Sequence, residues 1–273
     1  MIVFPFAKIN LGLNVLRKRE DGFHAIESVL VPIPLRDALE AIVDPSLTPG
    51  EAVLTRSGAP VPGNVQDDLC LKAVDVLRLV RPLPGLRLHL HKVIPVGAGL
   101  GGGSSDAAHV LLLLNDLLDL RLEPTQLQTM AAELGSDCPF FLNEHPQLAE
   151  GRGEQLSPIA LDLRGQWLAL VDPGIHVGTA EAYRNTTPTG RSMDLRSALA
   201  GDPDSWSTAV VNTMEPYVLR NHGAVAGVKA TLQEAGAYYA AMSGSGSNVF
   251  GLFRSQPTLP AFPTDHRVWI LRL

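Results

Sequence analysis

The chain has 273 residues and a mass of 29.2 kDa, which suits one large domain or two modest ones. Hydrophobic residues make up 45% and charged residues 18% of it, which excludes a disordered or collagen-like chain. The formal net charge of −6 excludes a general nucleic-acid binder, because such proteins carry a basic surface. An anionic small molecule stays open as a ligand, since helix N-termini and backbone amides bind phosphate whatever the net charge.

Signals for secretion, metal binding and membrane insertion are missing from the sequence. The two cysteines, Cys70 and Cys138, have neither metal-site spacing nor a C-x-x-C pattern, so a reducing compartment is expected. The N-terminal segment lacks the basic region of a signal peptide. The longest apolar run, residues 107–114, is too short to cross a bilayer. We therefore expect a cytoplasmic protein with no membrane partner.

Strands are expected in the first part of the chain, because its apolar residues run together or alternate. The expected strands are residues 2–4, 9–16 and 23–31. Asp21-Gly22 predicts a turn before the third strand, and Pro32 and Pro34 break the pattern after it. Residues 44–64 contain four prolines and several glycines, which predicts a loop with a short hairpin.

Helices dominate the next part of the chain. Apolar spacing predicts a helix over residues 67–80, and leucines alternating with polar residues predict a half-buried strand over 86–91. A glycine-rich segment follows, and then an apolar helix over 107–118. Pro124 opens another helix, which Gly135 is expected to end in a left-handed conformation.

The pattern restarts after residue 150, so a soft boundary near Gly151 is expected to separate domains 1–150 and 151–273. The second domain is expected to contain a buried strand, a polar loop with at most a short helix, a helix and a further strand. These are placed at residues 167–171, 185–204, 225–234 and 249–253. A second glycine- and serine-rich loop, residues 242–248, precedes the strand at 249–253.

Residues 97–105 carry the strongest chemical signal in the sequence. Five of the seven residues from Gly97 to Gly103 are glycine, which lets several backbone N–H groups point one way and lets a ligand approach closely. A helix N-terminus follows with unpaired donors and a partial positive charge. This combination predicts a phosphate-binding site.

Two common phosphate-binding folds do not fit this segment. A Walker loop requires a lysine before its final serine, and here Gly103 is followed directly by Ser104. The spacing of Gly97, Gly99 and Gly102 matches the dinucleotide pattern G-x-G-x-x-G, but that pattern also requires a second strand about 20 residues on. The sequence there predicts helices instead.

Three segments together resemble the motifs of the GHMP small-molecule kinases, which include galactose, homoserine, mevalonate and phosphomevalonate kinases. They are Pro5-Phe6-Ala7-Lys8-Ile9-Asn10-Leu11, the segment from Pro95 to Ser105, and Met242-Ser243-Gly244-Ser245-Gly246. Within that family, Asp21-Gly22-Phe23-His24 and Gly135-Ser136-Asp137-Cys138-Pro139-Phe140-Phe141 are similar to the branch that acts on cytidine-diphosphate-linked methylerythritol. The resemblance extends from about residue 5 to about residue 253.

The resemblance implies an α+β fold with two lobes and a cleft between them for ATP and substrate. The implied reaction is ATP-dependent phosphorylation of the 2-hydroxyl of the methylerythritol moiety, in the non-mevalonate route to isoprenoids. ATP and Mg²⁺ are the implied cofactors, and no residue is assigned as a metal ligand. The expected partner is this small molecule, with no nucleic acid, and the protein is expected to be a monomer or weak homodimer.

Lys8 and Asp137 match the catalytic lysine and aspartate of the family. An alcohol is a poor nucleophile, and an ionised aspartate can accept its proton or orient it toward the phosphorus. Lys8 can hold Asp137 in place or stabilise charge on the transferring group. Asp106, in the first turn of the helix, matches a position where the family has Asn or Asp. A favourable interaction with the helix dipole of about 0.3–1 kcal/mol explains it, and a role at a metal ion is the alternative.

The resemblance also implies ligand-binding residues. Those for ATP are Pro95, Val96, Gly97, Ala98, Gly99, Leu100, Gly101, Gly102, Gly103, Ser104 and Ser105. Phe23, where the family usually has tyrosine, and His24 match positions that meet the cytosine, and Tyr183 matches an aromatic on its other side. Asn10 and Thr179 match polar positions near the methylerythritol hydroxyls. The adenine pocket is expected to include residues 56–70, and the second glycine turn is expected to lie beside the first.

Other functions stay open on the sequence alone. A related kinase for another small alcohol, of the mevalonate phosphate or homoserine type, would be separated by turnover with a panel of alcohols. A Rossmann-type oxidoreductase would bind NAD(H) in place of ATP. A non-enzymatic module would bind nucleotide without releasing ADP.

Overall fold

The computed structural model describes residues 1–273, and the chain divides into two compact units. The first unit comprises residues 1–7, 35–96 and 101–144, and the second comprises residues 8–34, 97–100 and 145–273. The chain therefore enters each unit more than once, and the glycine-rich segment is divided between them. The boundary expected after residue 150 stays a prediction.

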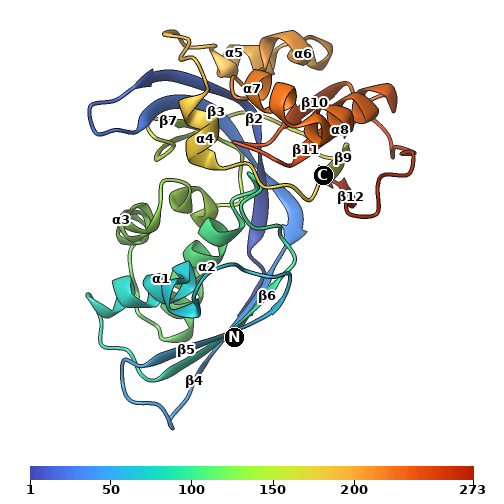
Figure 1. Ribbon diagram of the computed structural model, residues 1–273. Helices are drawn as coiled ribbons and strands as arrows, with labels where there is room; N and C mark the ends of the chain where they lie inside the picture. Colours follow the sequence, from blue (N-terminus) through green and yellow to red (C-terminus); the bar gives the residue numbers. More distant parts are fainter. The chain divides into compact units, whose positions relative to one another are not determined.

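The first unit contains a four-stranded sheet in the order β1-β4-β6-β5, with helices packed on it (Figure 1). Its strands are β1 (Ile2–Val3), β4 (Ala38–Val43), β5 (Ala52–Gly58) and β6 (Leu86–Lys92). Its helices are α1 (Leu69–Arg78), α2 (Gly102–Leu117) and α3 (Pro124–Leu134), with the short 3-10 helices η1 (Val65–Asp67) and η2 (Cys138–Leu142). β6 pairs with β4 in antiparallel and with β5 in parallel orientation, so that Leu88 lies beside Ala41 and Leu54.

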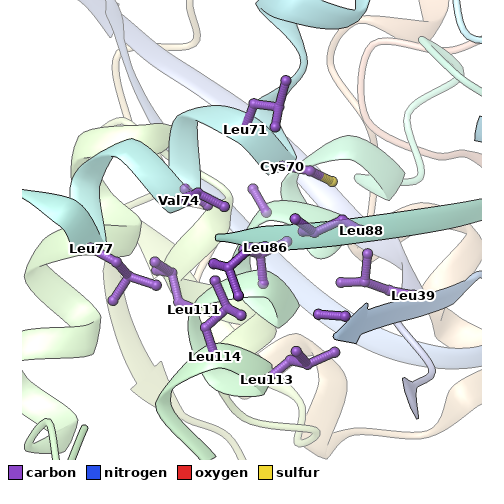
Figure 2. Close-up of a cluster of buried hydrophobic side chains, with 14 of the residues drawn as sticks. Leu39, Cys70, Leu71, Val74, Leu77, Leu86, Leu88, Leu111, Leu113 and Leu114 are labelled. Carbon is purple, nitrogen blue, oxygen red and sulfur yellow. The ribbon is translucent and has the colours of Figure 1, made fainter. Parts of the chain in front are cut away.

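The core of the first unit joins β6 to the helix that follows the glycine-rich segment. Leu86 and Leu88 of β6 pack in one buried cluster with Leu111 and Leu114 of α2 and with Leu77 of α1 (Figure 2). None of these five side chains is measurably exposed. Full burial of such a side chain stabilises the fold by about 1.5–3 kcal/mol. This packing fixes both ends of the chain that connects β6 to α2.

The second unit contains two four-stranded sheets, in the orders β2-β3-β7-β8 and β10-β11-β9-β12. The strands are β2 (Phe6–Lys18), β3 (His24–Arg36), β7 (Gln147–Glu150), β8 (Gln155–Pro158), β9 (Trp167–Asp172), β10 (Tyr239–Met242), β11 (Val249–Phe253) and β12 (Arg267–Arg272). The first two residues of β2 and the last two of β3 belong to the first unit. Helix α8 packs on β10 and β11.

The helices of the second unit are mostly short. They are α4 (Thr179–Arg184), α5 (Leu195–Ala200), η3 (Pro203–Ser205), α6 (Trp206–Ala209), α7 (Glu215–Asn221) and α8 (Gly223–Glu234). No helix of the protein has both the length and the apolar composition needed to cross a membrane.

Most of the predicted elements are confirmed, as is the α+β class. The clearest are α1, β6, α3, β9, α8 and β11. Local capping explains why two of the helices begin where they do. The Asp68 side chain accepts a hydrogen bond from the Cys70 N–H at the start of α1, and Glu123 and Gln126 form a reciprocal capping box before α3.

Two predictions about strands are wrong. β3 continues through Pro32 and Pro34 to Arg36, although these prolines were expected to break it. Its partner β7 pairs only with Ser28 to Leu30, so the missing N–H groups of the prolines fall beyond that ladder. The 44–64 segment contains the seven-residue strand β5, which pairs with β6 in place of the expected short hairpin.

Two predictions about helix ends are also wrong. α2 begins at Gly102, five residues before the expected start, because its glycine turn is packed directly against the end of β6. Gly135 has a φ of 170°, which is extended backbone and not the left-handed conformation expected at the end of α3.

Candidate active site

The glycine-rich segment turns through left-handed backbone and ends in an open helix N-terminus. Gly97, Gly99 and Gly101 have φ values of 68°, 79° and 70°. Gly101 is the N-cap of α2, and no side chain caps the helix there. The first N–H groups of α2 therefore lack a side-chain acceptor, and such groups bind anions. Pro95, which precedes the turn, is buried, while Val96 is exposed.

Two of these glycines are required by close packing. A Cβ on Gly99 would lie 2.0 Å from the carbonyl oxygen of Ser243, a distance that no side chain tolerates. A Cβ on Gly102 would lie 2.9 Å from Cγ2 of Ile94 and 3.2 Å from Nζ of Lys92. The first turn of α2 therefore sits directly on the end of β6.

The two serines at the start of α2 have different surroundings. Ser104 is half-buried, whereas Ser105 is fully buried and its hydroxyl lies 3.4 Å from Nδ1 of His109. The imidazole also lies 2.8 Å from the Ser105 carbonyl oxygen. Burial lowers the pKa of His109 below the usual value for histidine, so the ring is neutral at pH 7.

The second glycine turn packs against the first, as the sequence predicts. The Ser243 hydroxyl donates to the Gly99 carbonyl oxygen at 2.9 Å, and the Asn248 amide donates to that of Ala98, also at 2.9 Å. The Asn212 amide donates to the carbonyl oxygen of Gly244 at 2.8 Å, and this bond stabilises the second glycine turn. Side-chain donors thus bind the carbonyl oxygens of Ala98 and Gly99, and these hydrogen bonds fix the backbone of this segment.

Lys8 lies on β2 with its ammonium group beside the glycine-rich segment. Only 4% of the residue is exposed. Its Nζ donates to Oδ1 of Asn10 at 2.5 Å and to the carbonyl oxygen of Gly99 at 2.8 Å. The amide of Asn10 donates to the Ser28 hydroxyl at 2.8 Å. The structure therefore brings together two predicted site residues, Lys8 and Asn10, with part of the predicted phosphate-binding segment.

Asp137 directly precedes η2, in the first unit. It is half-buried, and its carbonyl oxygen accepts the Phe140 N–H at 3.2 Å. The rings of Phe140 and Phe141 pack edge to face with their centroids 5.0 Å apart, which anchors this turn. Burial raises the pKa of the neighbouring Cys138 to about 11, so its thiol is protonated and unreactive at neutral pH. Because Lys8 belongs to the second unit, its approach to Asp137 stays a prediction.

Two of the residues predicted to bind cytosine are in contact. His24 and Tyr183 stack with their centroids 4.9 Å apart and their planes 19° apart. Phe23 is 53% exposed, and Cζ of Arg152 lies 5.0 Å from the centre of its ring. Thr179, at the start of α4, has its hydroxyl 3.1 Å from that of Ser245 in the second glycine turn.

A cavity of about 250 Å³ lies in the first unit beside the start of α2. Its lining residues are Arg56, Val61, Pro62, Gly63, Asn64, Asp67, Asp68, Leu69, Leu90, Lys92, Val96, Gly103 and Asp106. Arg56 is held in an ion pair with Asp68 at 3.2 Å. Residues 56–70 were expected to help form an adenine pocket, and several of them line this cavity.

The sequence analysis missed several of the residues around these features. Ser28, Arg152 and the buried pair Asp37 and Lys92 were not singled out. One signal was available for Arg152, which stands between two glycines. Another was available for Lys92, a charge at the end of a strand that leads into the glycine-rich segment.

Comparison with known proteins identifies the family. The model of the GHMP kinases N terminal domain matches residues 68–145, and that of GHMP kinases C terminal matches residues 195–262. A 4-diphosphocytidyl-2-C-methyl-D-erythritol kinase of Parabacteroides distasonis is 45% identical over 258 residues, covering 94% of this chain and 93% of the relative. One of Cytophaga hutchinsonii is 44% identical, covering 94% of each. The chain belongs to the 4-diphosphocytidyl-2-C-methyl-D-erythritol kinase family.

Solved structures agree with this placement among the GHMP kinases. A crystal structure of a 4-(cytidine 5'-diphospho)-2C-methyl-D-erythritol kinase is 33% identical, with a TM-score of 0.74, covering 92% of this chain and 90% of that one. A homoserine kinase from Cytophaga hutchinsonii is 17% identical, with a TM-score of 0.69, covering 100% and 95%. That second likeness shows the fold alone. In this member of the 4-diphosphocytidyl-2-C-methyl-D-erythritol kinase family, the first family model spans the glycine-rich segment and Asp137, and the second spans the second glycine turn.

Proposed function

We propose that this chain transfers the γ-phosphoryl group of ATP to the 2-hydroxyl of 4-diphosphocytidyl-2-C-methyl-D-erythritol, a step in the non-mevalonate route to isoprenoid precursors. The observation that carries the proposal is the 45% identity to a relative of that name, over nearly the full length of both chains. A second support is the uncapped N-terminus of α2 at the end of the glycine-rich segment.

The polyphosphate of ATP is assigned to the segment from Pro95 to Ser105. Glycines with left-handed backbone conformations set the direction of its backbone groups. The first turn of α2 provides N–H donors with a partial positive charge. Charge on a transferring phosphoryl group is spread over three oxygens, so fixed donors at this position stabilise it without reorganising. The base and ribose of ATP are assigned to the cavity beside α2, whose walls include Val61, Leu69 and Leu90.

Lys8 and Asp137 are assigned to the chemical step. The carboxylate of Asp137 orients the 2-hydroxyl and accepts its proton as the phosphoryl group is transferred. The ammonium group of Lys8 is held by Asn10 and by the Gly99 carbonyl, which places a fixed positive charge beside the phosphate-binding segment. That charge stabilises negative charge that develops in the transition state.

The cytidine end of the substrate is assigned to Phe23, His24 and Tyr183. Aromatic rings stack on the faces of a base, and a neutral imidazole offers one donor and one acceptor to the edge of the base. The stacking of His24 on Tyr183 supports this assignment, because it joins two residues that are far apart in the sequence and are both assigned to the base. Asn10 and Thr179 are assigned to the methylerythritol hydroxyls.

Mg²⁺ is the metal that the family implies. No group of three or more His, Cys, Asp or Glu side chains is arranged to hold a metal ion. Mg²⁺ in kinases is bound by substrate phosphates and water with one or two carboxylates, so a cluster of three protein ligands is not required for an ion that arrives with the nucleotide. When bound, it would neutralise charge on the phosphates, and no residue of the chain is assigned as its ligand.

Acceptor-dependent release of ADP tests this function. Purified protein is mixed with ATP and Mg²⁺ and with one acceptor at a time: 4-diphosphocytidyl-2-C-methyl-D-erythritol, mevalonate phosphate or homoserine. We expect ADP release only with the first acceptor. Release with another alcohol at a comparable rate would assign a different kinase activity, and release with none would contradict a kinase function.

A further inference from the structure

Three ionisable side chains are buried against one another under the first turn of α2. Asp37, Lys92 and Asp106 are 1%, 3% and 3% exposed. Nζ of Lys92 donates to Oδ2 of Asp37 at 2.5 Å and to Oδ2 of Asp106 at 2.7 Å. A Cβ on Gly102 would lie 3.2 Å from that nitrogen, which places it directly beneath the phosphate-binding turn. We call these three residues the α2 triad.

The two carboxyl groups of the α2 triad have different hydrogen bonds. Oδ1 of Asp37 accepts the N–H groups of Val93 and Ile94 at 2.5 and 2.9 Å, and its Oδ2 accepts from Lys92. Both oxygens of Asp37 therefore act as acceptors, as an ionised carboxylate requires. Oδ1 of Asp106 is buried and accepts no hydrogen bond. That oxygen has no partner in either form, and a buried charge without a partner costs far more than a neutral carboxyl group, so the site favours a protonated Asp106.

Charge balance gives the same assignment. One ammonium and two carboxylates would leave a net negative charge in the interior, where nothing else in the triad compensates it. Burial raises the pKa of Asp106 to about 8, and the charge of Asp37 adds to this, although Lys92 opposes it. Burial lowers the pKa of Lys92, but its attraction to Asp106 and Asp37 outweighs burial, so Lys92 stays charged. The extra proton therefore belongs on Asp106.

We propose that Asp106 is a positioning residue for the nucleotide that acts in its protonated form, because its proton keeps the α2 triad neutral beneath the phosphates. Asp106 follows the phosphate-binding turn of α2 directly and lines the cavity assigned to the nucleoside, as Lys92 does. Loss of the proton would put a buried negative charge next to a bound polyphosphate, and like charges at short range repel. The inference rests on the proposed function only in placing ATP at this helix start.

The other charged or titratable groups around this cavity do not explain a change near the same pH. Arg56 and Asp68 are paired with each other, and Asp67 is exposed. Burial raises the pKa of Cys70 on α1, so its thiol stays neutral. Burial lowers the pKa of His109 on α2, so its ring is also neutral above pH 7. The α2 triad is therefore the group expected to change charge as the pH rises through about 8.

Nucleotide affinity across this pH range tests the proposal. The probe is the β,γ-imido analogue of ATP with Mg²⁺ and no acceptor, and its Kd is measured by calorimetry at pH 7.5 and 9.0. If nucleotide binding requires the proton, the Kd of the wild type rises at least about threefold between pH 7.5 and 9.0. The rise approaches about eightfold if only the protonated form binds. Asp106→Asn keeps the shape and stays neutral, so its Kd should stay constant. Asp116→Asn, which removes an exposed carboxylate of α2 away from the cavity, should keep the rise of the wild type.

A smaller rise in the wild type, or an equal rise in Asp106→Asn, would overturn the proposal. Should Asp106→Asn fail to fold, ¹³C NMR of wild-type protein labelled in its aspartate carboxyl groups decides the matter. One carboxyl titrating near pH 8 supports the proposal, and ionisation of every aspartate by pH 6 overturns it. Because binding is measured without acceptor, failure to phosphorylate the substrate contradicts only the proposed function. No nucleotide binding at either pH would overturn both.

Discussion

Lys8 and Asp106 are both buried ionisable side chains, and the groups that surround them differ. Lys8 is surrounded by acceptors, the Asn10 amide oxygen and the Gly99 carbonyl, which suit an ammonium group. Asp106 shares its one donor, Lys92, with a second carboxylate. The same degree of burial therefore favours a charged group in one place and a neutral group in the other.

The assignment of the chemical step predicts a large loss of turnover from two substitutions. Asp137→Asn and Lys8→Ala should each lower kcat at least about a hundredfold, the lower range for a general acid–base group. Steady-state ADP release with the cytidine substrate measures this, and thermal unfolding checks that each variant is folded. Lys18→Ala, at the exposed end of the same strand, and Asp116→Asn, exposed on α2, serve as controls. Near-wild-type turnover in a folded Asp137→Asn or Lys8→Ala variant refutes its assigned role.

The assignment of cytosine recognition predicts an effect on one substrate only. His24→Ala removes the ring that stacks on Tyr183 and the groups that meet the base edge. Its KM for the cytidine substrate should rise about tenfold, as the loss of about 1.4 kcal/mol of binding implies, while its KM for ATP stays nearly constant. His145→Ala, at an exposed position, is the control. Equal increases in both KM values would argue against a role in binding cytosine.

The α2 triad also predicts a pH dependence of stability. The pKa of Asp106 is raised from 3.8 to about 8 in the folded protein, so folding takes up a proton between those values. The stabilisation is complete below about pH 4 and is lost progressively as the pH rises to about 8. Denaturant unfolding should show the wild type losing stability relative to Asp106→Asn from pH 5 to 8, and no further above it. A constant difference across this range would show that Asp106 is ionised in the folded protein.

At the scale of whole elements, local sequence patterns predicted the helices and strands that are determined by local interactions. The alternating leucines of β6 and the capped start of α3 each contain their own signal. β5 was missed because prolines surround it and because its parallel pairing with β6 is a contact between distant residues. α2 starts among glycines because packing against Ile94 and Lys92 outweighs their low helix propensity.

In the candidate site, too, the features with a local sequence pattern were predicted, and those formed by distant residues were missed. The two glycine turns were predicted, and so was their contact, because glycine and serine clusters mark such turns in the sequence. The α2 triad was missed because Asp37 and Lys92 are 55 positions apart and neither belongs to a local pattern. The sequence analysis favoured an interaction of an ionised Asp106 with the helix dipole, whereas burial of Asp106 beside Asp37 and Lys92 favours its neutral form.

The first turn of α2 predicts that stability and nucleotide binding can be separated. A Cβ on Gly103 would meet only Cδ1 of Leu69, at an ordinary 3.7 Å, so Gly103→Ala should fold and gain up to about 1 kcal/mol. The added methyl group would stand where the polyphosphate approaches the backbone, so the KM for ATP should rise severalfold. Thermal unfolding and steady-state kinetics measure the two effects. An unchanged KM for ATP would place the phosphates elsewhere.

At the scale of the whole molecule, the predicted site residues come from both compact units. Asp137 and the start of α2 lie in the first unit, and Lys8, Asn10, His24 and Tyr183 lie in the second. The chain passes from one unit to the other within β2, within β3 and on both sides of Gly97 to Leu100. Each compact unit is therefore built from several separate stretches of the chain.

The central claim concerns which oxygen receives the phosphoryl group. The 2-carbon of the acceptor carries a methyl group, so its hydroxyl is a tertiary alcohol that NMR distinguishes from the others. We predict that the product formed with ATP shows a new phosphomonoester whose phosphorus is coupled to that quaternary carbon. Phosphorus coupled to any other carbon of the acceptor, or ADP formed without a phosphorylated acceptor, would contradict the proposed function.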